Sequence, residues 1–350
     1  MNKNIIEIRN LSVHFKTDEG VVKAVDDVSL DIKKGRTLGI VGESGCGKSV
    51  TSQALLRITP RPGEVTGQIL LYEKNKKALE EPINLVKLDP NSSEIRTIRG
   101  GTISIIFQEP MKAFSPLHTI GNQITEGIML HREPIYNEAR KIAIDMLREV
   151  GIANPEQRID QYPHQLSGGM RQRAMIAMAM SCSPSLLIAD EPTTALDVTI
   201  QAQVLRMIND LKHAHESTIL FITHDLGVIA EMADDVAVMY LGKVVEYANV
   251  DTIFYNARHP YTLALLKSIP SLQEGESKKK LFSIEGTVPY AMNLPPGCGF
   301  YSRCPNGIEG VCNVDEIPYI EISETHFVRC KRIAIGAIDG GEARWNQKKY

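Results

Sequence analysis

The alternation of apolar and polar residues divides the start of the chain into two kinds of segment. Residues 5–15 (IIEIRNLSVHF) and 21–35 (VVKAVDDVSLDIKKG) change polarity at short intervals, which is typical of strands with one face in a core. Residues 37–42 (TLGIVG) are almost wholly apolar, as in a parallel strand buried on both faces, and the helical pattern of residues 49–58 follows a glycine-rich loop. We therefore expect an antiparallel start and then the first unit of an α/β fold.

The middle of the chain predicts a helical insert between strands. A strand is expected at residues 102–108 (TISIIFQ), and residues 137–151 form the clearest amphipathic helix of the insert, ending on a glycine. The apolar segments 185–190 (SLLIAD) and 217–223 (STILFIT) then alternate with a helix at residues 199–214. This alternation restores the pattern of an α/β protein.

The length of 350 residues exceeds what one core usually holds, about 250 to 300 residues, so two compact units are expected. We place the boundary near residue 250, because the strand-like residues 235–247 are followed by a helix at 262–269, a charged linker at 271–280 and a segment rich in cysteine. The formal charge of −3 leaves no broad basic surface, so no nucleic-acid partner is expected.

The N-terminus and the hydropathy of the chain bear on its location. MNKNIIEIRN lacks the apolar core of about 7 to 15 residues that a signal peptide has, and no run reaches the roughly 18 apolar residues of a membrane span. We therefore expect a protein that stays in the cytoplasm. In that reducing compartment, clustered cysteines indicate a metal site or a reactive centre rather than disulfides.

Residues 42–49, GESGCGKS, have the spacing of a phosphate-binding loop. The motif follows a buried strand and opens a helix, so backbone N–H groups and a helix N-terminus would face a phosphate. Lys48 would bridge the β- and γ-phosphates of a nucleotide, and the Ser49 hydroxyl would ligate Mg²⁺. The predicted nucleotide contacts in this segment are Gly42, Glu43, Ser44, Gly45, Cys46, Gly47, Lys48, Ser49 and Val50.

Two acidic residues, Asp190 and Glu191, stand at the end of the apolar segment SLLIADE. At the carboxyl edge of a parallel sheet, Asp190 would hold Mg²⁺ directly or through water. Glu191 would lie one residue further on, where it could accept a proton from an attacking water as a general base. The pair is weak evidence alone and gains weight beside a phosphate-binding loop.

The segment LSGGMRQR, from Leu166, resembles the signature of the ATP-binding-cassette (ABC) ATPases, which other P-loop families lack. The resemblance implies an α/β fold with a P-loop ABC ATPase architecture: a RecA-like core, an antiparallel β subdomain and a helical subdomain at about residues 109–185, within a nucleotide-binding domain of residues 1–250. The motifs occur in the order of that family, namely the phosphate-binding loop, Gln108 in IIFQEP, the signature, Asp190 and Glu191, Asp197 at the end of TALD, and His224 in FITHD.

The resemblance implies a role for each motif. Gln108 would contact Mg²⁺ and the attacking water, and His224 would bind the γ-phosphate and orient the attack. Phe15 would stack on the adenine ring, with simple core packing as the alternative. The implied catalytic residues are Lys48, Gln108, Glu191 and His224, and the implied Mg²⁺ ligands are Ser49, Gln108 and Asp190.

A second subunit is implied as well. Ser167, Gly168 and Gly169 would face the γ-phosphate bound by a partner cassette, and Asp197 would lie at the same interface. The partner is expected to be a second ABC ATPase subunit, with a homodimer as an option for the isolated chain. Each ATP-binding site would then be completed only across the dimer.

The segments HPYTLALLKSIP, EGTVP and PPGCGFYSRCP resemble the oligopeptide and dipeptide permease ATPases. This resemblance implies a subunit that hydrolyses ATP to import dipeptides or oligopeptides. Residues 251–350 would be its C-terminal domain, a small cysteine-containing appendage with a metal-cluster site. Two transmembrane permease subunits and an extracytoplasmic solute-binding protein are the implied partners, at the cytoplasmic face of the cell membrane. A nickel-type importer ATPase of the same family and a cytosolic ABC ATPase of repair or translation are the alternatives.

Four of the six cysteines, Cys298, Cys304, Cys312 and Cys330, lie near the C-terminus with 5, 7 and 17 residues between them. Four thiolates suit a [4Fe–4S] cluster or tetrahedral Zn²⁺, and the short pairs typical of zinc sites do not occur. The resembling permease ATPases carry this pattern with an iron–sulfur cluster, so [4Fe–4S] is the prediction and Zn²⁺ or free cysteines are the alternatives. Its role would be a structural staple or, alternatively, redox sensing.

Overall fold

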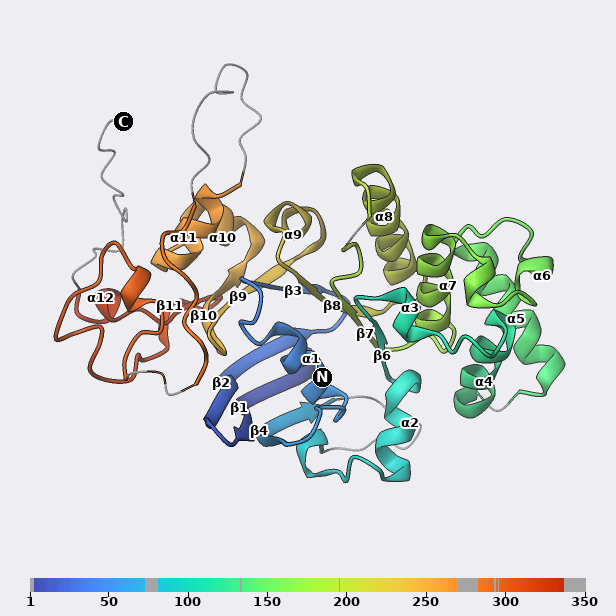
Figure 1. Cartoon of the computed structure of the whole chain (residues 1–350), viewed down its shortest axis with the longest axis horizontal. Coiled ribbons are helices and arrows are strands. Elements are labelled where there is room, and N and C mark those ends of the chain that lie inside the picture. Colours follow the sequence, from blue (N-terminus) through green and yellow to red (C-terminus); the bar gives the residue numbers. More distant parts are fainter. Residues whose placement is uncertain are drawn as a thin grey trace, which may run out of the picture.

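The computed structural model describes residues 3–72, 81–132, 134–194, 196–269, 283–292, 294 and 296–336. Two β-sheets organise this part of the chain, and most helices of the insert gather at the end of the molecule opposite the C-terminal strands (Figure 1). The predicted linker at 271–280 lies outside the described residues. No helix in the described ranges has the length and apolar character needed to cross a bilayer.

The first sheet is antiparallel, as the alternating pattern at the start of the chain predicts. Its first two strands are long, and together they bury one face of the sheet, because alternate side chains point into the same core. The strand order is β2-β1-β4-β5, with β1 at Asn4–Thr17, β2 at Gly20–Lys33, β4 at Gly63–Leu71 and β5 at Ile83–Asn84.

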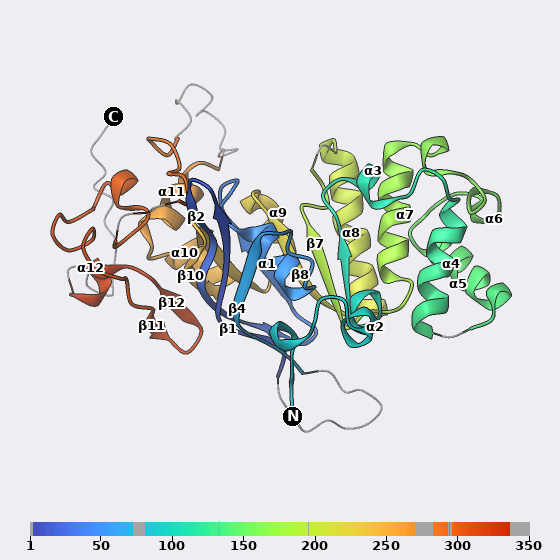
Figure 2. The same cartoon turned by 60° about the horizontal axis from the view of Figure 1, so that its bottom comes forward.

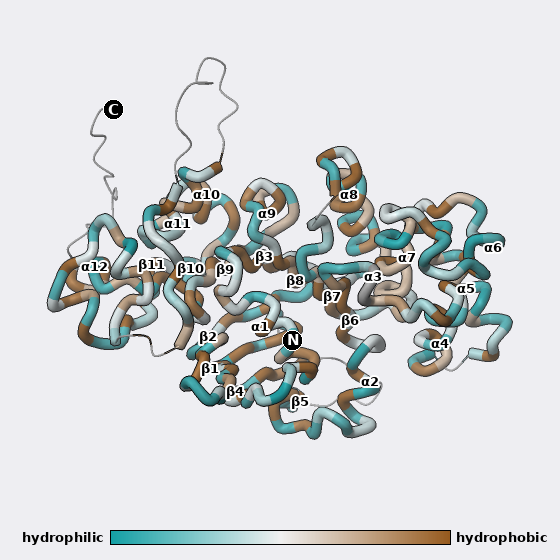
Figure 3. Tube along the Cα trace, in the orientation of Figure 1, coloured by the Kyte–Doolittle hydropathy of each residue, from teal (hydrophilic) through white to brown (hydrophobic). Residues whose placement is uncertain are grey.

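The second sheet has eight strands and carries the nucleotide motifs. The five strands from β9 to β6 in the order given below are parallel and fully or largely buried, which explains their nearly unbroken apolar sequences. Figure 3 shows this concentration of apolar residues along β3, β7, β8 and β9. The order is β11 (Ile320–Ser323), β12 (His326–Val328), β10 (Lys243–Asn249), β9 (Asp235–Tyr240), β3 (Thr37–Val41), β8 (Thr218–Thr223), β7 (Leu186–Asp190) and β6 (Ile103–Ile106).

The segment 235–247, predicted as strand-like throughout, is a hairpin of β9 and β10. The turn falls at Leu241 and Gly242, whose φ angles of 44° and 76° are left-handed. A Cβ at Gly242 would lie 2.9 Å from the Lys23 carbonyl oxygen, so the turn needs glycine for space as well as for conformation. The sequence pattern did not reveal this turn, because mainly apolar residues precede and follow it.

The insert is helical, as expected. Its long helices α4, α5 and α7 pack on one another (Figure 2), and α5 ends before Gly151, which has a left-handed φ of 76°. The helices of the insert are α3 (Pro110–Ala113), α4 (Ile120–Arg132), α5 (Tyr136–Glu149), α6 (Pro155–Arg158) and α7 (Gly168–Met180). The helices of the remaining chain are α1 (Lys48–Leu55), α2 (Ser93–Gly101), α8 (Val198–Ala214), α9 (Leu226–Met232), α10 (Val250–Asn256), α11 (Pro260–Lys267) and α12 (Lys331–Ala334).

The described C-terminal region joins the central sheet. The sequence predicts a small appendage, but β12 pairs with β10 through Glu246 opposite Val328 and Tyr247 opposite Phe327. This region therefore extends the sheet that carries the phosphate-binding loop. The division of the chain near residue 250, between β10 and α10, stays a prediction.

A buried carboxylate ties the C-terminal region to β10. Glu246 is fully buried; its Oε1 lies 2.8 Å from His326 Nε2, and its two oxygens accept hydrogen bonds from the backbone N–H groups of Arg258 at 2.6 Å and His259 at 3.0 Å. Three donors from two separate segments thus converge on one side chain, which fixes both segments on the sheet.

Removal of this side chain should destabilise the protein strongly. Glu246→Ala leaves buried donors without an acceptor, so we expect the free energy of unfolding to fall by about 3 kcal/mol, measured by urea denaturation. Glu316→Ala is the control, because its carboxylate pairs with Lys243 but is 79% exposed, and it should leave the unfolding midpoint unchanged. Equal midpoints for both variants would contradict the structural role of Glu246.

Candidate nucleotide-binding site

The order of the parallel strands assembles the candidate site. The carboxyl ends of neighbouring strands β3, β8, β7 and β6 lie at one edge of the sheet, and each is followed by a predicted site segment. A cavity of about 690 Å³ opens at this edge. Its lining residues are Ala24, Gly42, Glu43, Ser44, Gly45, Gly47, Lys48, Ser49, Val50, Gln108, Glu191, Thr194, His224 and Leu265.

The phosphate-binding loop has the conformation that its glycines allow. Gly47 precedes α1 with a left-handed φ of 104°, and a Cβ there would lie 2.2 Å from the Ala24 carbonyl oxygen. Only glycine fits between the loop and β2. Cys46 is the one loop residue that does not line the cavity; its side chain is buried, and burial raises the pKa of its thiol.

Lys48 bonds to the loop itself, and Ser49 connects the loop to β7. Lys48 is 5% exposed, and its Nζ donates to the carbonyl oxygens of Gly42 at 2.7 Å and Glu43 at 3.1 Å. The Ser49 hydroxyl donates to Asp190 Oδ1 at 3.0 Å. Burial raises the pKa of Asp190, against the opposing effects of Ser49 and Lys48. A buried carboxylate beside a hydroxyl is a suitable donor pair for a hard cation such as Mg²⁺.

Glu191 is the centre of a second group of contacts in the cavity. Its Oε2 accepts hydrogen bonds from Gln108 Nε2 and the Thr194 hydroxyl, each at 3.0 Å, and its Oε1 lies 3.4 Å from His224 Nδ1. Its φ of 48° is unusual for a residue other than glycine and turns the chain directly after β7. Thr194 was not among the site residues predicted from the sequence. Its position three residues after Glu191, within the same turn, could have indicated this contact.

The predicted interface residues do not line this cavity. Ser167 caps α7, where its hydroxyl accepts a hydrogen bond from the Met170 N–H at 3.3 Å. Asp197 caps α8, where Oδ1 accepts from the N–H groups of Thr199 at 3.1 Å and Ile200 at 3.0 Å. A Cβ at Gly168 or Gly169 would meet no atom within 4 Å, so the start of α7 is open on the chain's own surface.

Phe15 also lies outside the cavity lining. Its ring is partly buried on β1 and packs against the core shared by the two sheets. The sequence left two roles open for Phe15, adenine stacking and core packing. Its contacts within this chain are those of core packing. Its role toward adenine stays a prediction.

The four C-terminal cysteines come together in space. Their side chains are free thiols that line one small cavity of about 10 Å³, and Cys298 donates its N–H to the Cys312 carbonyl oxygen at 2.7 Å. Burial, together with the charges of the other three cysteines, raises the pKa of Cys298 to about 12. Among the residues that the structure describes, however, no group of three or more His, Cys, Asp or Glu is arranged to hold a metal ion.

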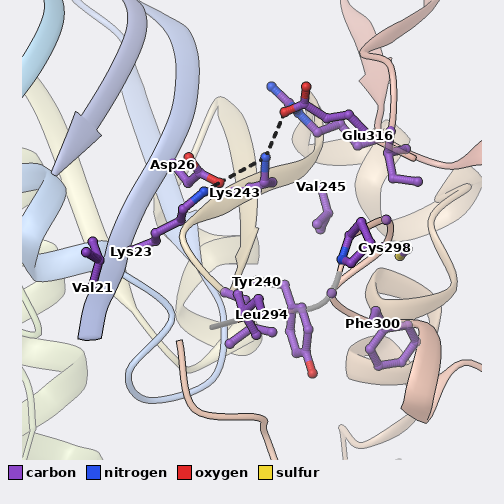
Figure 4. Close-up of a pocket in the computed structure, with 16 residues that line it drawn as sticks. Val21, Lys23, Asp26, Tyr240, Lys243, Val245, Leu294, Cys298, Phe300 and Glu316 are labelled. Atoms are coloured by element: carbon purple, nitrogen blue, oxygen red, sulfur yellow. Dashed lines mark hydrogen bonds and ion pairs between the residues drawn. The ribbon is translucent and has the colours of Figure 1, made fainter. Parts of the chain in front are cut away.

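A further cavity, of about 380 Å³, lies between β2, the β9–β10 hairpin and the segment around Cys298 (Figure 4). Its charged residues pair with one another: Lys243 Nζ lies 3.2 Å from Asp26 and 3.4 Å from Glu316. Arg329 pairs with Asp27 on β2 at 2.7 Å. The cavity of about 690 Å³, which is lined by Lys48 and the phosphate-binding loop, is therefore the better site for a polyanion.

Comparisons with known proteins agree with this geometry. The family model described as "ABC transporter" matches residues 25–194, and the model described as "Oligopeptide/dipeptide transporter, C-terminal region" matches residues 245–312. The chain is similar to a dimeric ATP-binding cassette solved after hydrolysis with ADP and Pi bound, with a TM-score of 0.59, 27% identity, and coverage of 70% of this chain and 98% of that one.

Curated relatives match over nearly the whole chain. A probable peptide ABC transporter ATP-binding protein of Sinorhizobium fredii is 47% identical, covering 94% of this chain and 95% of the relative. The oligopeptide transport ATP-binding protein OppD of Bacillus subtilis is 46% identical, with coverage of 93% and 88%, and the dipeptide transport ATP-binding protein DppD of the same organism is 46% identical, with 94% of each. The chain belongs to the family of ATP-binding proteins of oligopeptide and dipeptide ABC transporters.

Proposed function

We propose that this protein hydrolyses ATP to energise the import of dipeptides or oligopeptides through an ABC transporter. The single observation that carries the proposal is the cavity that unites Lys48, Gln108, Glu191 and His224 beside the phosphate-binding loop. The names of relatives 46% to 47% identical over almost the whole chain support the peptide assignment.

ATP binding would begin at the phosphate-binding loop. Lys48, held by two loop carbonyls, would turn its ammonium group toward the β- and γ-phosphates. Ser49 and Asp190 would hold Mg²⁺, together with Gln108, which follows β6, the strand beside β7. The bound Mg²⁺ would neutralise charge on the phosphates.

Hydrolysis would depend on the contacts of Glu191. Gln108 and Thr194 hold one carboxylate oxygen by hydrogen bonds, which leaves the oxygen on the His224 side to accept a proton from water. His224 is 62% exposed, so its ring is free to meet the γ-phosphate. We propose Glu191 as the general base and His224 as the residue that orients the γ-phosphate.

The remaining proposed contacts need a second cassette. The open N-terminus of α7 and Asp197 lie away from the chain's own cavity, which supports an arrangement in which each signature completes the site of a partner ATPase subunit. Two transmembrane permease subunits would meet the helical insert at the cytoplasmic face of the membrane, and a solute-binding protein would deliver the peptide.

Transport assays test the proposal. The protein is assembled with its permease subunits in vesicles, and uptake of labelled dipeptides, longer peptides and Ni²⁺ is compared with and without ATP. We expect ATP-dependent peptide uptake. Uptake of Ni²⁺ alone would favour the nickel-type alternative, and purification without any polytopic subunit would favour a role in repair or translation.

We also propose that the four C-terminal cysteines bind a [4Fe–4S] cluster. Their convergence on one cavity supports the proposal, whereas the described side chains offer no ready set of metal ligands. No step of ATP hydrolysis is assigned to the cluster. A structural role agrees with the position of the cysteines in a region of short elements, since metal binding can stabilise such folds.

Anaerobic purification followed by iron, sulfide and zinc analysis tests this assignment. We expect iron and sulfide with a broad visible absorbance, lost in Cys312→Ser and retained in the control Cys182→Ser, because Cys182 lies outside the cysteine cavity. A colourless protein that contains zinc would contradict the iron–sulfur assignment and favour a Zn²⁺ site. Absence of both metals would leave four free thiols.

A further inference from the structure

The C-terminal region contacts the phosphate-binding loop at Glu43. The Arg303 guanidinium meets the Glu43 carboxylate with two hydrogen bonds, from Nη1 to Oε2 at 2.7 Å and from Nη2 to Oε1 at 3.1 Å. These residues are 260 positions apart. A paired, planar contact of this kind fixes the position of the carboxylate.

Arg303 is itself held firmly. Its side chain is 4% exposed, Nε donates to the Glu285 carbonyl oxygen at 3.1 Å, and Nη1 also lies 3.3 Å from the Tyr240 hydroxyl. Its Cζ lies 5.9 Å from the centre of the Tyr240 ring and 6.0 Å from that of Phe300. The hydrogen bond with Glu43 raises the pKa of Arg303, so the guanidinium stays charged.

A second C-terminal residue holds the backbone of Glu43. The Glu43 N–H donates to the hydroxyl of Tyr261, on α11, at 2.9 Å. Tyr261 is fully buried, and its ring packs on Tyr240 at 4.6 Å and on Phe300 at 5.3 Å between ring centres. Figure 4 shows Tyr240 and Phe300 side by side where the β9–β10 hairpin meets the C-terminal segment.

These contacts bear on the phosphate site for two reasons. Glu43 lines the cavity, so its carboxylate, if released, would stand beside a polyanionic ligand and repel it. In addition, the Glu43 carbonyl oxygen accepts a hydrogen bond from Lys48 Nζ, so the residue held by Arg303 and Tyr261 also holds the lysine.

We propose that Arg303, together with Tyr261, is a positioning residue of the nucleotide site: it holds Glu43 away from the phosphates and makes ATP affinity depend on the C-terminal region. This inference rests on the proposed ATPase function. The segments around Tyr261 and Arg303 would thus contribute to ATP binding, in addition to any contribution to transporter assembly.

The test measures the dissociation constant of ATP·Mg²⁺ for full-length variants by fluorescence titration, together with the KM and kcat of hydrolysis. We expect Arg303→Ala to raise the dissociation constant and KM by about tenfold or more, with a much smaller change in kcat. Arg303→Lys keeps one charge but loses the paired geometry, so an intermediate increase is expected and provides a second variant if Arg303→Ala folds poorly.

Two comparisons separate positioning from general stability. In a Glu43→Gln background, adding Arg303→Ala should change the dissociation constant by less than about threefold, because the charge that Arg303 holds is gone. Arg329→Ala is the matched control, since the buried Arg329 side chain also joins the C-terminal region to the first sheet, through an ion pair with Asp27, but does not touch the loop. It should leave ATP affinity unchanged.

Three results would overturn the positioning role. These are an unchanged dissociation constant in Arg303→Ala and Arg303→Lys, an equal increase in Arg329→Ala, or an increase that persists in the Glu43→Gln background. Failure of the wild-type protein itself to bind ATP·Mg²⁺ would instead overturn the proposed ATPase function and this role with it.

Discussion

Glu191→Gln should lower the rate constant of ATP hydrolysis by about 100-fold to 10 000-fold while ATP binding persists. The amide has the shape of the carboxylate, so the contacts with Gln108 and Thr194 can be kept in part. It cannot accept a proton from water, which removes the step assigned to Glu191. ATP should therefore accumulate on the protein and hold two cassettes together.

Steady-state hydrolysis, ATP titration and size-exclusion chromatography with ATP·Mg²⁺ measure these effects. Glu231→Gln is a matched control, because Glu231 is an exposed residue of α9 that does not line the cavity. This control should keep the wild-type rate. Near-normal turnover in Glu191→Gln would remove Glu191 from its proposed role and direct attention to His224.

Lys48→Ala should weaken ATP binding by about 100-fold and abolish detectable hydrolysis. Lys48 is the lysine whose buried ammonium group reaches the loop carbonyls, and alanine leaves the β- and γ-phosphates without that charge. A charged hydrogen bond to phosphate contributes about 2 to 3 kcal/mol, which corresponds to this change in the dissociation constant.

A second buried lysine provides the control for Lys48. Lys212 donates to the Thr37 hydroxyl at 3.0 Å and lies 3.4 Å from Asp234, at the end of β3 remote from the loop. Lys212→Ala should lower the unfolding temperature but retain ATP affinity. Unchanged affinity in Lys48→Ala would contradict the assignment of the loop as a phosphate site.

Short-range signals explain why much of the architecture could be predicted. The apolar runs at 37–42, 185–190 and 217–223 are β3, β7 and β8, since a strand buried on both faces needs no polar side. The turn between β9 and β10 and the pairing of β12 with β10 were missed, because neither changes the local pattern of polarity.

The amino-acid sequence by itself determined the phosphate-binding loop, the strands that precede the site residues and the family resemblance, because these depend on residues close together in the chain. Only the tertiary structure decided that β3, β8, β7 and β6 stand side by side and so bring Lys48, His224, Glu191 and Gln108 to one cavity. It also decided the contact of Arg303 with Glu43 and the gathering of four cysteines around one small cavity. Such contacts join distant segments, and their partners are chosen by the packing of the whole fold rather than by any local pattern.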